Sequence, residues 1–208
     1  MPVDEWKLDI VASGSQKGYM IPPGLSFIEM SQKAWEAAEK SNLPKFYLNL
    51  KSYRKSLSSN SNPYTPAVNL VFALDEALKM MRDEGLENIF RRHNKHKLAI
   101  SNAVKVLNLK LFADEKYLSP SVTAIKTEGM NAEQFRKTIK DKFDILLAGG
   151  QDHLKGKIFR VGHLGYVNDR DIVTVISAIS STLLDLGKIS AQQAGEALVV
   201  VSKYLEEN

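Results

Sequence analysis

Hydrophobic and polar positions follow two different periods along the chain, which predicts a mixture of strands and helices. Near the N-terminus, short apolar runs at 9–12 and 25–30 are bounded by glycine and proline, a pattern typical of strands. Ser31 precedes a helix expected from 32 to about 40, where it can serve as the N-cap. The stretch 56–66 is rich in serine, asparagine and proline and is expected to be an irregular loop.

From residue 67 the pattern becomes strongly helical, because apolar residues recur three and four positions apart. The Glu84-Gly85 pair either bends this helix or is tolerated within it, and helical periodicity resumes as far as Leu107. Beyond that point, strand and helix patterns alternate, which predicts a small α/β domain with helices covering a sheet. Strands are expected at 109–112, 122–126, 145–148 and 157–161, and helices at 132–142, 170–186 and 191–205.

The composition is that of a soluble globular chain, with 208 residues of which 44% are hydrophobic and 25% charged. It contains no cysteine, which excludes a disulfide framework, a cysteine-ligated metal centre and a cysteine nucleophile. The first residues lack the basic and apolar regions of a targeting signal. The longest uncharged apolar-rich run, 172–184, is shorter than the ~20 residues that span a bilayer. We therefore expect a cytoplasmic protein.

The net charge of +4 is unevenly distributed. Residues 1–84 carry 10 basic and 10 acidic side chains, whereas residues 85–208 carry 18 and 14. This excess can form a solvated helix face or a phosphate-binding patch for nucleic acid. No aromatic platform or nucleic-acid motif accompanies it, which favours the solvated face. Much of the excess lies in one predicted helix, at Arg91, Arg92, Lys95 and Lys97.

Lys17 is a candidate nucleophile, because it follows the first predicted strand in a turn of small residues, Ser13-Gly14-Ser15. A lysine amine is nucleophilic near neutral pH only when burial or a neighbouring cation lowers its pKa. The apolar residues at 19–21 offer a surface that could bury it. Most lysines after turns are surface charges, so the residues by themselves leave both roles open.

Arg160 is the second candidate, because it lies inside an apolar strand between Phe159 and Val161. An arginine in such a strand is costly unless it pairs with an anion, and its planar fork fits a carboxylate. That carboxylate can belong to an internal Asp or Glu or to a ligand. His163, three residues further on, is better explained as a structural residue than as a catalytic one.

His93 and His96 are spaced three residues apart and could in principle share a metal ion. The cationic side chains around them repel a metal, and no carboxylate supports them at helical spacing. We therefore expect no metal site. The sequence also contains no glycine-rich phosphate loop of the nucleotide-binding kinds.

Several motifs occur in the order found in one known family. The chain resembles the class V, fold-type I, pyridoxal-phosphate-dependent aminotransferases, in their alanine–glyoxylate and serine–pyruvate (serine–glyoxylate) branch. The resemblance covers essentially the whole chain. The motifs are SGSQKGYMIPPGLSF (13–27), PYTPAV (63–68) and KIFRVGHLG (157–165), with FYLNLK (46–51), EGLENIFRRH (84–93) and LAGGQ (147–151) between them.

The resemblance implies a role for each of five residues. Lys17 is similar to the lysine that forms the internal aldimine with pyridoxal 5'-phosphate and then moves the proton between substrate Cα and cofactor C4′. Gln16 corresponds to the glutamine that lines the cofactor pocket beside it. Thr65 and Tyr64 correspond to loop residues that reach the cofactor phosphate of the neighbouring subunit, which implies a homodimer with a shared active site. Arg160 corresponds to the arginine that binds the substrate α-carboxylate.

The resemblance also implies a division of the chain. Residues 1–84 correspond to the end of the large cofactor-binding domain, with the lysine loop and the dimer-facing loop. Residues 85–208 correspond to the small C-terminal α/β domain. Members of the family are considerably longer, and the parts that bind the phosphate, stack on the ring and pair with the pyridinium nitrogen precede the matched region. We therefore expect residues 1–208 by themselves to bind the cofactor poorly and to transaminate negligibly.

Related activities can be separated by residue type. Cysteine desulfurases need a mobile cysteine and carry histidine in place of Gln16, so they are excluded. Phosphoserine aminotransferases need extra basic residues for a second phosphate, and no clear candidates are present. The resemblance thus implies transamination of a small amino acid, alanine or serine, with a 2-oxo acid such as glyoxylate or pyruvate. The alternative is a catalytically inert fragment that only dimerises or binds a partner.

Overall fold

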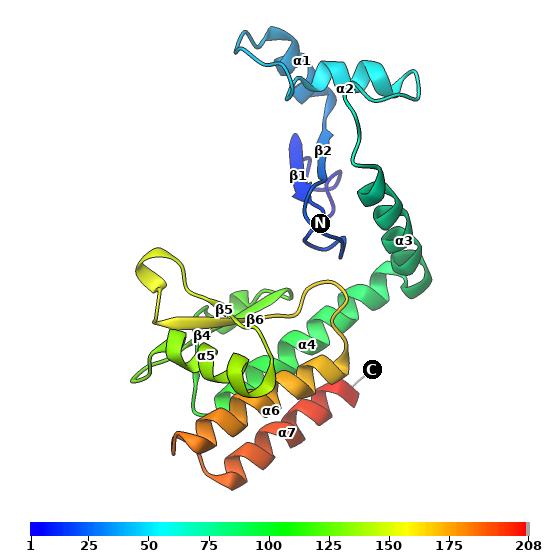
Figure 1. Ribbon diagram of the computed structural model, residues 1–208. Coiled ribbons are helices and arrows are strands. Elements are labelled where there is room, and N and C mark those ends of the chain that lie inside the picture. Colours follow the sequence, from blue (N-terminus) through cyan, green and yellow to red (C-terminus); the bar gives the residue numbers. More distant parts are fainter. Residues whose placement is uncertain (207–208) are drawn as a thin grey trace. The chain divides into compact units, whose positions relative to one another are not determined.

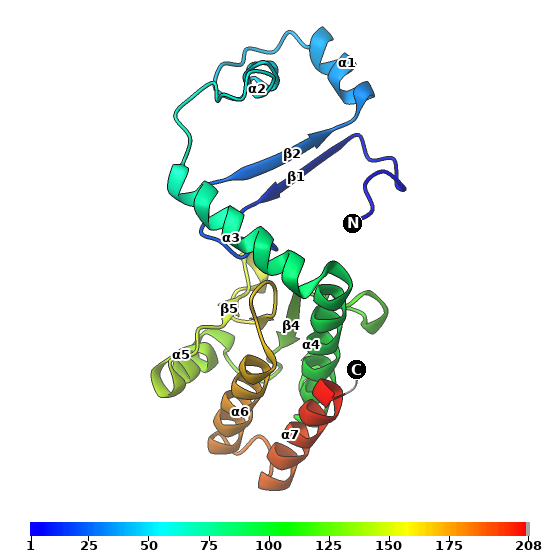
Figure 2. The same cartoon turned by 90° about the vertical axis from the view of Figure 1, so that its right-hand side faces the viewer.

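The computed structural model describes residues 1–206 and forms two compact units, which divide in the sequence between Met80 and Met81. Figure 1 and Figure 2 show their helices and strands. Among the described residues, no helix combines the length and the apolar character that crossing a membrane requires.

The first unit contains an antiparallel pair of strands that is plainly seen in Figure 2. β1 (Ile10–Gly14) pairs with β2 (Ser26–Met30) along its whole length, with Gly14 opposite Ser26. The hydroxyl of Ser31 then accepts a hydrogen bond from the Ala34 amide and begins α1 (Gln32–Lys40). Both strands and the capped helix agree with the sequence prediction.

Two further helices complete this part of the chain, and one of them was not predicted. α2 (Leu50–Leu57) begins after Asn49, whose side chain accepts a hydrogen bond from the Lys51 amide. It has only two turns and few apolar positions, so its periodicity is weak. The loop predicted at 56–66 therefore starts only after Leu57. α3 (Val68–Glu84) follows this loop.

Gly85 separates α3 from α4 (Leu86–Val106). Its φ of 82° lies in the left-handed region, which glycine adopts without steric strain. The helical pattern on both sides of the Glu84-Gly85 pair therefore corresponds to two separate helices. α4 lies wholly within the second unit.

The second unit is built on a four-stranded antiparallel sheet with the order β3-β4-β6-β5. β4 (Val122–Lys126) and β6 (Ile158–Gly162) are central, and β3 (Lys110–Leu111) is one edge. The other edge strand, β5 (Ala148–Gly149), begins three residues later than predicted. The physical reason is that the Leu147 carbonyl is bonded to Arg136 Nε, 2.8 Å away, instead of to a neighbouring strand.

Helices cover one face of this sheet, as Figure 1 shows. They are α4, α5 (Ala132–Phe143) and α6 (Asp169–Asp185), and α7 (Ala191–Glu206) packs on α4 and α6. Two short 3-10 helices, Glu115–Tyr117 and Asp152–Leu154, lie in the connections. The core between sheet and helices is apolar and closely packed, with Ile100, Ile125, Phe159 and Ile176 among its fully buried members. The predicted α/β arrangement of this part is confirmed.

Candidate active site

Ser15 organises the loop that carries Lys17. It directly follows β1 and is fully buried. Its hydroxyl donates to the Pro22 carbonyl oxygen, 2.7 Å away, and accepts from the Leu25 amide at 3.1 Å. The Ser15 amide also donates to the Leu25 carbonyl at 3.0 Å. These bonds close the connection between β1 and β2 into a tight loop, a role of Ser15 that the sequence did not reveal.

Lys17 and Gln16 lie on the outside of this loop, and both side chains are exposed. The neighbouring apolar residues turn inward instead, since Ile21 is buried and the Tyr19 ring contacts Phe27 at 4.2 Å between centroids. The burial of Lys17 against residues 19–21 that the sequence suggested is therefore not found. Its amine has no hydrogen-bond or ion-pair partner within residues 1–206.

The side chain of Gln16 lies back over Gly14. A Cβ atom on Gly14 would come within 2.8 Å of Gln16 Oε1, so glycine makes the room that this amide occupies. Gln16 directly precedes the lysine in sequence, and its side-chain amide makes no hydrogen bond within residues 1–206.

Tyr64 and Thr65 lie in the loop before α3, and they differ in what they contact. The Tyr64 hydroxyl donates to the Phe46 carbonyl at 3.1 Å, and its ring packs against Tyr47 at 4.7 Å between centroids. Tyr64 is thus used to hold the loop. The Thr65 hydroxyl is exposed and has no partner among residues 1–206. It lies just before the N-terminal end of α3, where the helix dipole favours an anion such as phosphate.

No hydrogen bond or ring contact within the described residues joins the Tyr64–Thr65 loop to the Lys17 loop. The first unit contains Gln16, Lys17, Tyr64 and Thr65, and the second contains Arg160. The free groups of the first unit, an amine and a hydroxyl, fit a cofactor that carries an aldehyde and a phosphate. They are the groups that the motif resemblance assigns to pyridoxal phosphate.

Arg160 lies in the middle of β6, as predicted, on the face of the sheet opposite the helices. Its neighbours Phe159 and Val161 are buried in the core, and successive side chains of a strand point to opposite faces. Its Nε donates to the Gly149 carbonyl at 2.9 Å. None of the ion pairs within residues 1–206 includes Arg160, so the internal salt bridge is not found. Its two terminal amino groups are available for a ligand carboxylate.

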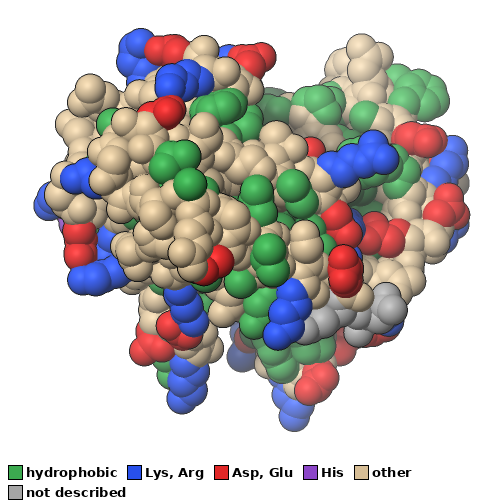
Figure 3. Space-filling view, turned by 90° about the horizontal axis from the view of Figure 1, so that it is seen from below, with side chains coloured by type: hydrophobic (Ala, Val, Ile, Leu, Met, Phe, Trp, Pro, Cys, Tyr) green, Lys and Arg blue, Asp and Glu red, His purple; other side chains and the backbone are tan. Residues whose placement is uncertain are grey.

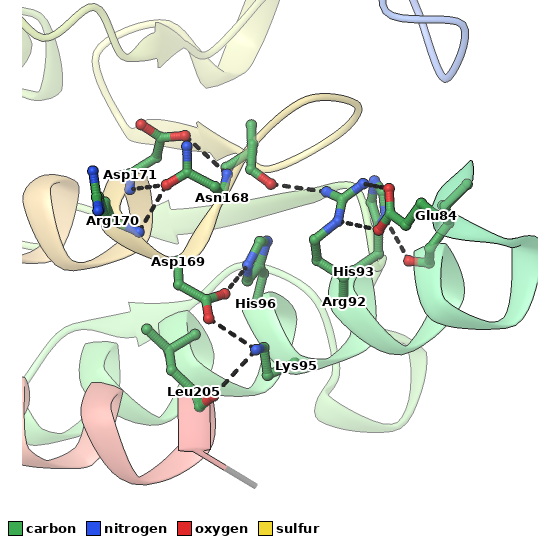
Figure 4. Close-up of polar contacts among 12 residues, drawn as sticks. Glu84, Arg92, His93, Lys95, His96, Asn168, Asp169, Arg170, Asp171 and Leu205 are labelled. Atoms are coloured by element: carbon green, nitrogen blue, oxygen red, sulfur yellow. Dashed lines mark hydrogen bonds and ion pairs between the residues drawn. The ribbon is translucent and has the colours of Figure 1, made fainter. Parts of the chain in front are cut away.

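Two of the basic residues of α4, Arg92 and Lys95, and the two helix histidines contact the start of α6 and the segment before it, as Figure 4 shows. His93 Nδ1 bonds the Ile89 carbonyl at 2.7 Å, and its Nε2 accepts from the Gly165 amide at 3.1 Å. His96 Nε2 instead contacts Asp169 Oδ1 at 2.8 Å. Each ring thus has its own structural partners. Within residues 1–206 no group of three or more His, Cys, Asp and Glu side chains is placed to hold a metal.

Burial and hydrogen bonding act in opposite directions on the pKa values of His96 and Asp169. Burial lowers the pKa of His96 and outweighs the hydrogen bond to Asp169. Burial opposes the ionisation of Asp169, but hydrogen bonds from Lys95 and His96 outweigh it and keep the Asp169 pKa below its usual value. His163 is fully buried and contacts Thr123 Oγ1 at 2.9 Å, and burial lowers its pKa to about 4. These contacts support the structural role expected for His163.

The basic residues of α4 are largely paired rather than presented to a polyanion. Arg92 pairs with Glu84 at 2.6 Å, and Lys95 pairs with Asp169 at 2.9 Å. On the face of the molecule seen in Figure 3, Lys and Arg side chains are likewise interspersed with Asp and Glu, and Lys105 of α4 pairs with Glu115 at 2.6 Å. This pairing supports a solvated helix face over a nucleic-acid surface.

A shallow hollow of about 550 Å³ lies beside the basic residues of α4. It is lined by Asn88, Arg91, Arg92, Lys95, Asn168, Asp169 and Arg170.

Comparison with known proteins decides the family. Residues 1–168 match the family model described as aminotransferase class-V. This chain belongs to the class V aminotransferases. The resemblance inferred from the lysine, loop and arginine motifs is therefore confirmed.

Relatives show how much of such a protein the chain covers. It is 36% identical to a serine–glyoxylate aminotransferase of Methylorubrum extorquens, over 99% of this chain and 52% of the relative. It is 56% identical to a protein of Synechococcus sp. named soluble hydrogenase, small subunit, over 90% of this chain and 49% of the relative. The chain spans about half the length of the curated relatives it matches.

Solved structures agree on the fold. The ureidoglycine–glyoxylate aminotransferase of Bacillus subtilis superposes with a TM-score of 0.88 at 30% identity, covering 97% of this chain and 54% of that one. An alanine–glyoxylate aminotransferase of Nostoc sp. gives 0.82 at 28% identity, over 87% and 49%. The expected fold class, the α/β architecture of fold-type I pyridoxal-phosphate transferases, is confirmed.

Proposed function

We propose that this chain is part of a pyridoxal-phosphate-dependent enzyme that transfers the amino group of alanine or serine to a 2-oxo acid such as glyoxylate or pyruvate. The observation that carries the proposal is Arg160. It is an arginine in the middle of an apolar strand, without an ion-pair partner in residues 1–206, and its two terminal amino groups are free. Such a group fits the carboxylate that amino acids and 2-oxo acids share.

Each of the five candidate residues has its own role in this proposal. Lys17 holds the cofactor through its amine and moves a proton at the substrate Cα, while Gln16 lines the pocket beside it. Thr65 contacts the phosphate with its free hydroxyl, and Tyr64 holds the loop that carries Thr65. Arg160 binds and orients the substrate carboxylate. The cofactor, when bound, supplies the electron sink for the proton transfer.

We infer that the active site is shared between two copies of the full-length protein in a cytoplasmic homodimer. The division expected from the motifs, a large-domain portion at 1–84 and a small domain at 85–208, places the four cofactor residues in the first part and Arg160 in the second. The first unit leaves large apolar side chains uncovered, with Phe46 80%, Leu48 78% and Phe72 71% exposed. Such a surface is typical of an interface. The absence of cysteine fits a reducing compartment.

A role in partner binding without catalysis is the second candidate. Two relatives that are 56% and 57% identical are named as subunits of a soluble hydrogenase. This chain has no cysteine with which to ligate an iron–sulfur cluster, so in such an assembly it would act as a binding subunit. On either view, residues 1–208 by themselves are expected to bind the cofactor poorly and to transaminate negligibly.

Borohydride reduction of the full-length protein with pyridoxal phosphate, followed by peptide mass analysis, separates the two candidates. Transamination requires a pyridoxyl adduct on Lys17 that is lost in Lys17→Ala and kept in Lys7→Ala, which alters another exposed lysine near the N-terminus. It also requires conversion of glyoxylate to glycine with alanine or serine as donor. Absence of an adduct at saturating cofactor, or an adduct only on another lysine, would reject the enzyme and leave the partner-binding role.

A further inference from the structure

Arg160 is fixed at one nitrogen and free at two. Its Nε donates a hydrogen bond to the Gly149 carbonyl oxygen, 2.9 Å away. Neither terminal amino group has a hydrogen-bond partner within residues 1–206. Because the guanidinium group is planar, a bond at Nε limits the rotation of the whole fork. The Gly149 carbonyl therefore sets the direction in which the two free amino groups point.

The strands beside Arg160 leave space for a ligand. Its neighbours across the sheet are Ala124 on β4 and Ala148 on β5, and each presents only a methyl group. Arg160 and these alanines occupy the sheet face opposite the helices that Figure 1 shows covering the core. A carboxylate can thus approach the fork without displacing a large cross-strand side chain.

The position of Gly149 itself depends on its lack of a side chain. A Cβ atom there would lie 2.5 Å from Arg136 Nη1 and 2.7 Å from Glu133 Oε1, both closer than atoms normally approach. These two side chains are ion-paired at 2.7 Å, and Arg136 Nε is also bonded to the Leu147 carbonyl at 2.8 Å. The Glu133–Arg136 pair therefore packs directly on the backbone of β5. The two close atoms are the ends of long side chains, so a side chain at 149 must either break the bonds that hold Arg136 to Glu133 and to Leu147 or shift the strand.

We propose that Gly149 is a positioning residue that orients the Arg160 guanidinium for the substrate carboxylate. This inference rests on the function proposed above, because it concerns the same arginine. It gives the LAGGQ motif a physical role, since Gly149 supplies the carbonyl that holds the arginine of the KIFRVGHLG motif. The requirement for glycine comes from the closeness of the Glu133–Arg136 pair and not from an unusual backbone angle, because Gly149 has no positive φ.

Steady-state kinetics of the full-length holoenzyme test this with four variants. Gly149→Ala should raise the KM for alanine and serine about tenfold, with a smaller change in kcat, because the fork is misaligned while Lys17 is untouched. Arg136→Ala added to Gly149→Ala should restore the KM to within about twofold of that of Arg136→Ala alone, since the closer contact is removed and the Glu133 side chain, without its ion-pair partner, can move away from residue 149. Gly195→Ala, in α7, adds its methyl group to open space away from the sheet and should match the wild type.

Arg160→Gln separates this inference from the function on which it rests. An unchanged KM in Arg160→Gln would remove the carboxylate role of Arg160 and with it the role of Gly149. A raised KM in Arg160→Gln together with a wild-type KM in Gly149→Ala would overturn the positioning role alone. The positioning role alone would also be overturned if adding Arg136→Ala did not restore the KM of Gly149→Ala.

A structure of the wild-type holoenzyme keeps the inference falsifiable if Gly149→Ala does not fold. The probe is 2-methylalanine, an amino acid without an α-hydrogen that cannot be transaminated. Nε of Arg160 should stay within hydrogen-bond distance of the Gly149 carbonyl while the terminal amino groups contact the carboxylate. A complex in which Nε leaves Gly149 to bind the ligand would overturn the inference.

Discussion

Arg92 and Glu84 form a bidentate ion pair, with Nε 2.6 Å from Oε1 and Nη2 3.0 Å from Oε2. The remaining amino group, Nη1, donates to the carbonyl oxygens of Gly165 and Val167, both at 2.8 Å. Figure 4 shows this contact set at the start of α4. A hydrogen bond from Arg92 also holds the pKa of Glu84 below its usual value. Arg92 therefore ties the beginning of α4 to the segment that follows β6.

Arg92→Ala should lower the free energy of unfolding by about 2–4 kcal/mol, because it leaves a half-buried carboxylate and two carbonyls without their donor. Urea denaturation of the full-length protein measures the loss. Arg91→Ala is the matched control, since Arg91 is exposed and has no partner within residues 1–206. Its effect should stay within about 0.5 kcal/mol. Equal losses in the two variants would show that the contacts of Arg92 do not stabilise the fold.

Burial of His163 should make the protein less stable in mild acid. Burial lowers its pKa to about 4, so the folded protein keeps the ring neutral in a range where the unfolded chain, with a pKa near 6.5, is protonated. The stabilisation is therefore complete above pH ~6.5 and is lost as the pH falls toward 4, by roughly 3 kcal/mol at most. Burial lowers the pKa of His96 as well, so protonation of His96 also lowers the free energy of unfolding in acid.

The measurement is the free energy of unfolding between pH 7 and pH 4.5. His163→Gln should flatten the dependence on pH by most of the part assigned to this ring. His153→Gln alters an exposed histidine and should keep the slope of the wild type. If His163→Gln keeps the full slope, proton uptake by other groups causes the acid sensitivity.

The elements that the sequence predicts well are those with a local signal. The β4 prediction matches residue for residue, and α1 follows its serine cap. The elements that it misses depend on single hydrogen bonds with weak local patterns. α2 needs the Asn49 cap, and β5 starts late because Arg136 takes the Leu147 carbonyl from eleven residues away in sequence. The hydrophobic periodicity of a sequence carries no information about such hydrogen bonds.

The same distinction holds for the candidate site. Lys17 and Arg160 follow from motifs, because their neighbours in sequence are characteristic of the family. The exposure of Lys17 and the Arg160–Gly149 bond do not follow, since both depend on which residues fold against them. The close approach of Arg136 to Gly149, and of the Leu154 backbone to Gly150, explains in retrospect why a glycine pair precedes the arginine strand.

Arg160→Lys tests whether the planar fork matters and not only its charge. A lysine keeps the positive charge but lacks the two parallel donors that match a carboxylate. In the full-length enzyme we expect a raised KM for every carboxylate substrate, with cofactor binding little changed because Lys17 and Thr65 remain. Absorbance of the bound cofactor and initial rates with alanine and serine measure the two effects. Kinetics like those of the wild type would reduce Arg160 to a structural residue.

Ser15→Ala should loosen the loop that carries Lys17 without altering any group proposed to touch the cofactor. The substitution removes the acceptor of the Leu25 amide and the donor to the Pro22 carbonyl, in a position that is fully buried. An unsatisfied buried amide costs about 1–3 kcal/mol, so opening of the loop should become easier by that amount. Hydrogen exchange at the Leu25 amide of the full-length protein should accelerate by about tenfold or more.

Ser13→Ala is the control for this change, because Ser13 lies two residues earlier in β1 and its exposed hydroxyl has no partner within residues 1–206. It should leave the exchange rate at Leu25 unaltered. A faster exchange in Ser15→Ala accompanied by weaker retention of pyridoxal phosphate would indicate that the serine holds the lysine loop in its binding geometry. An unchanged rate at Leu25 would mean that backbone pairing between Ser15 and Leu25 closes the loop by itself and that the hydroxyl is dispensable.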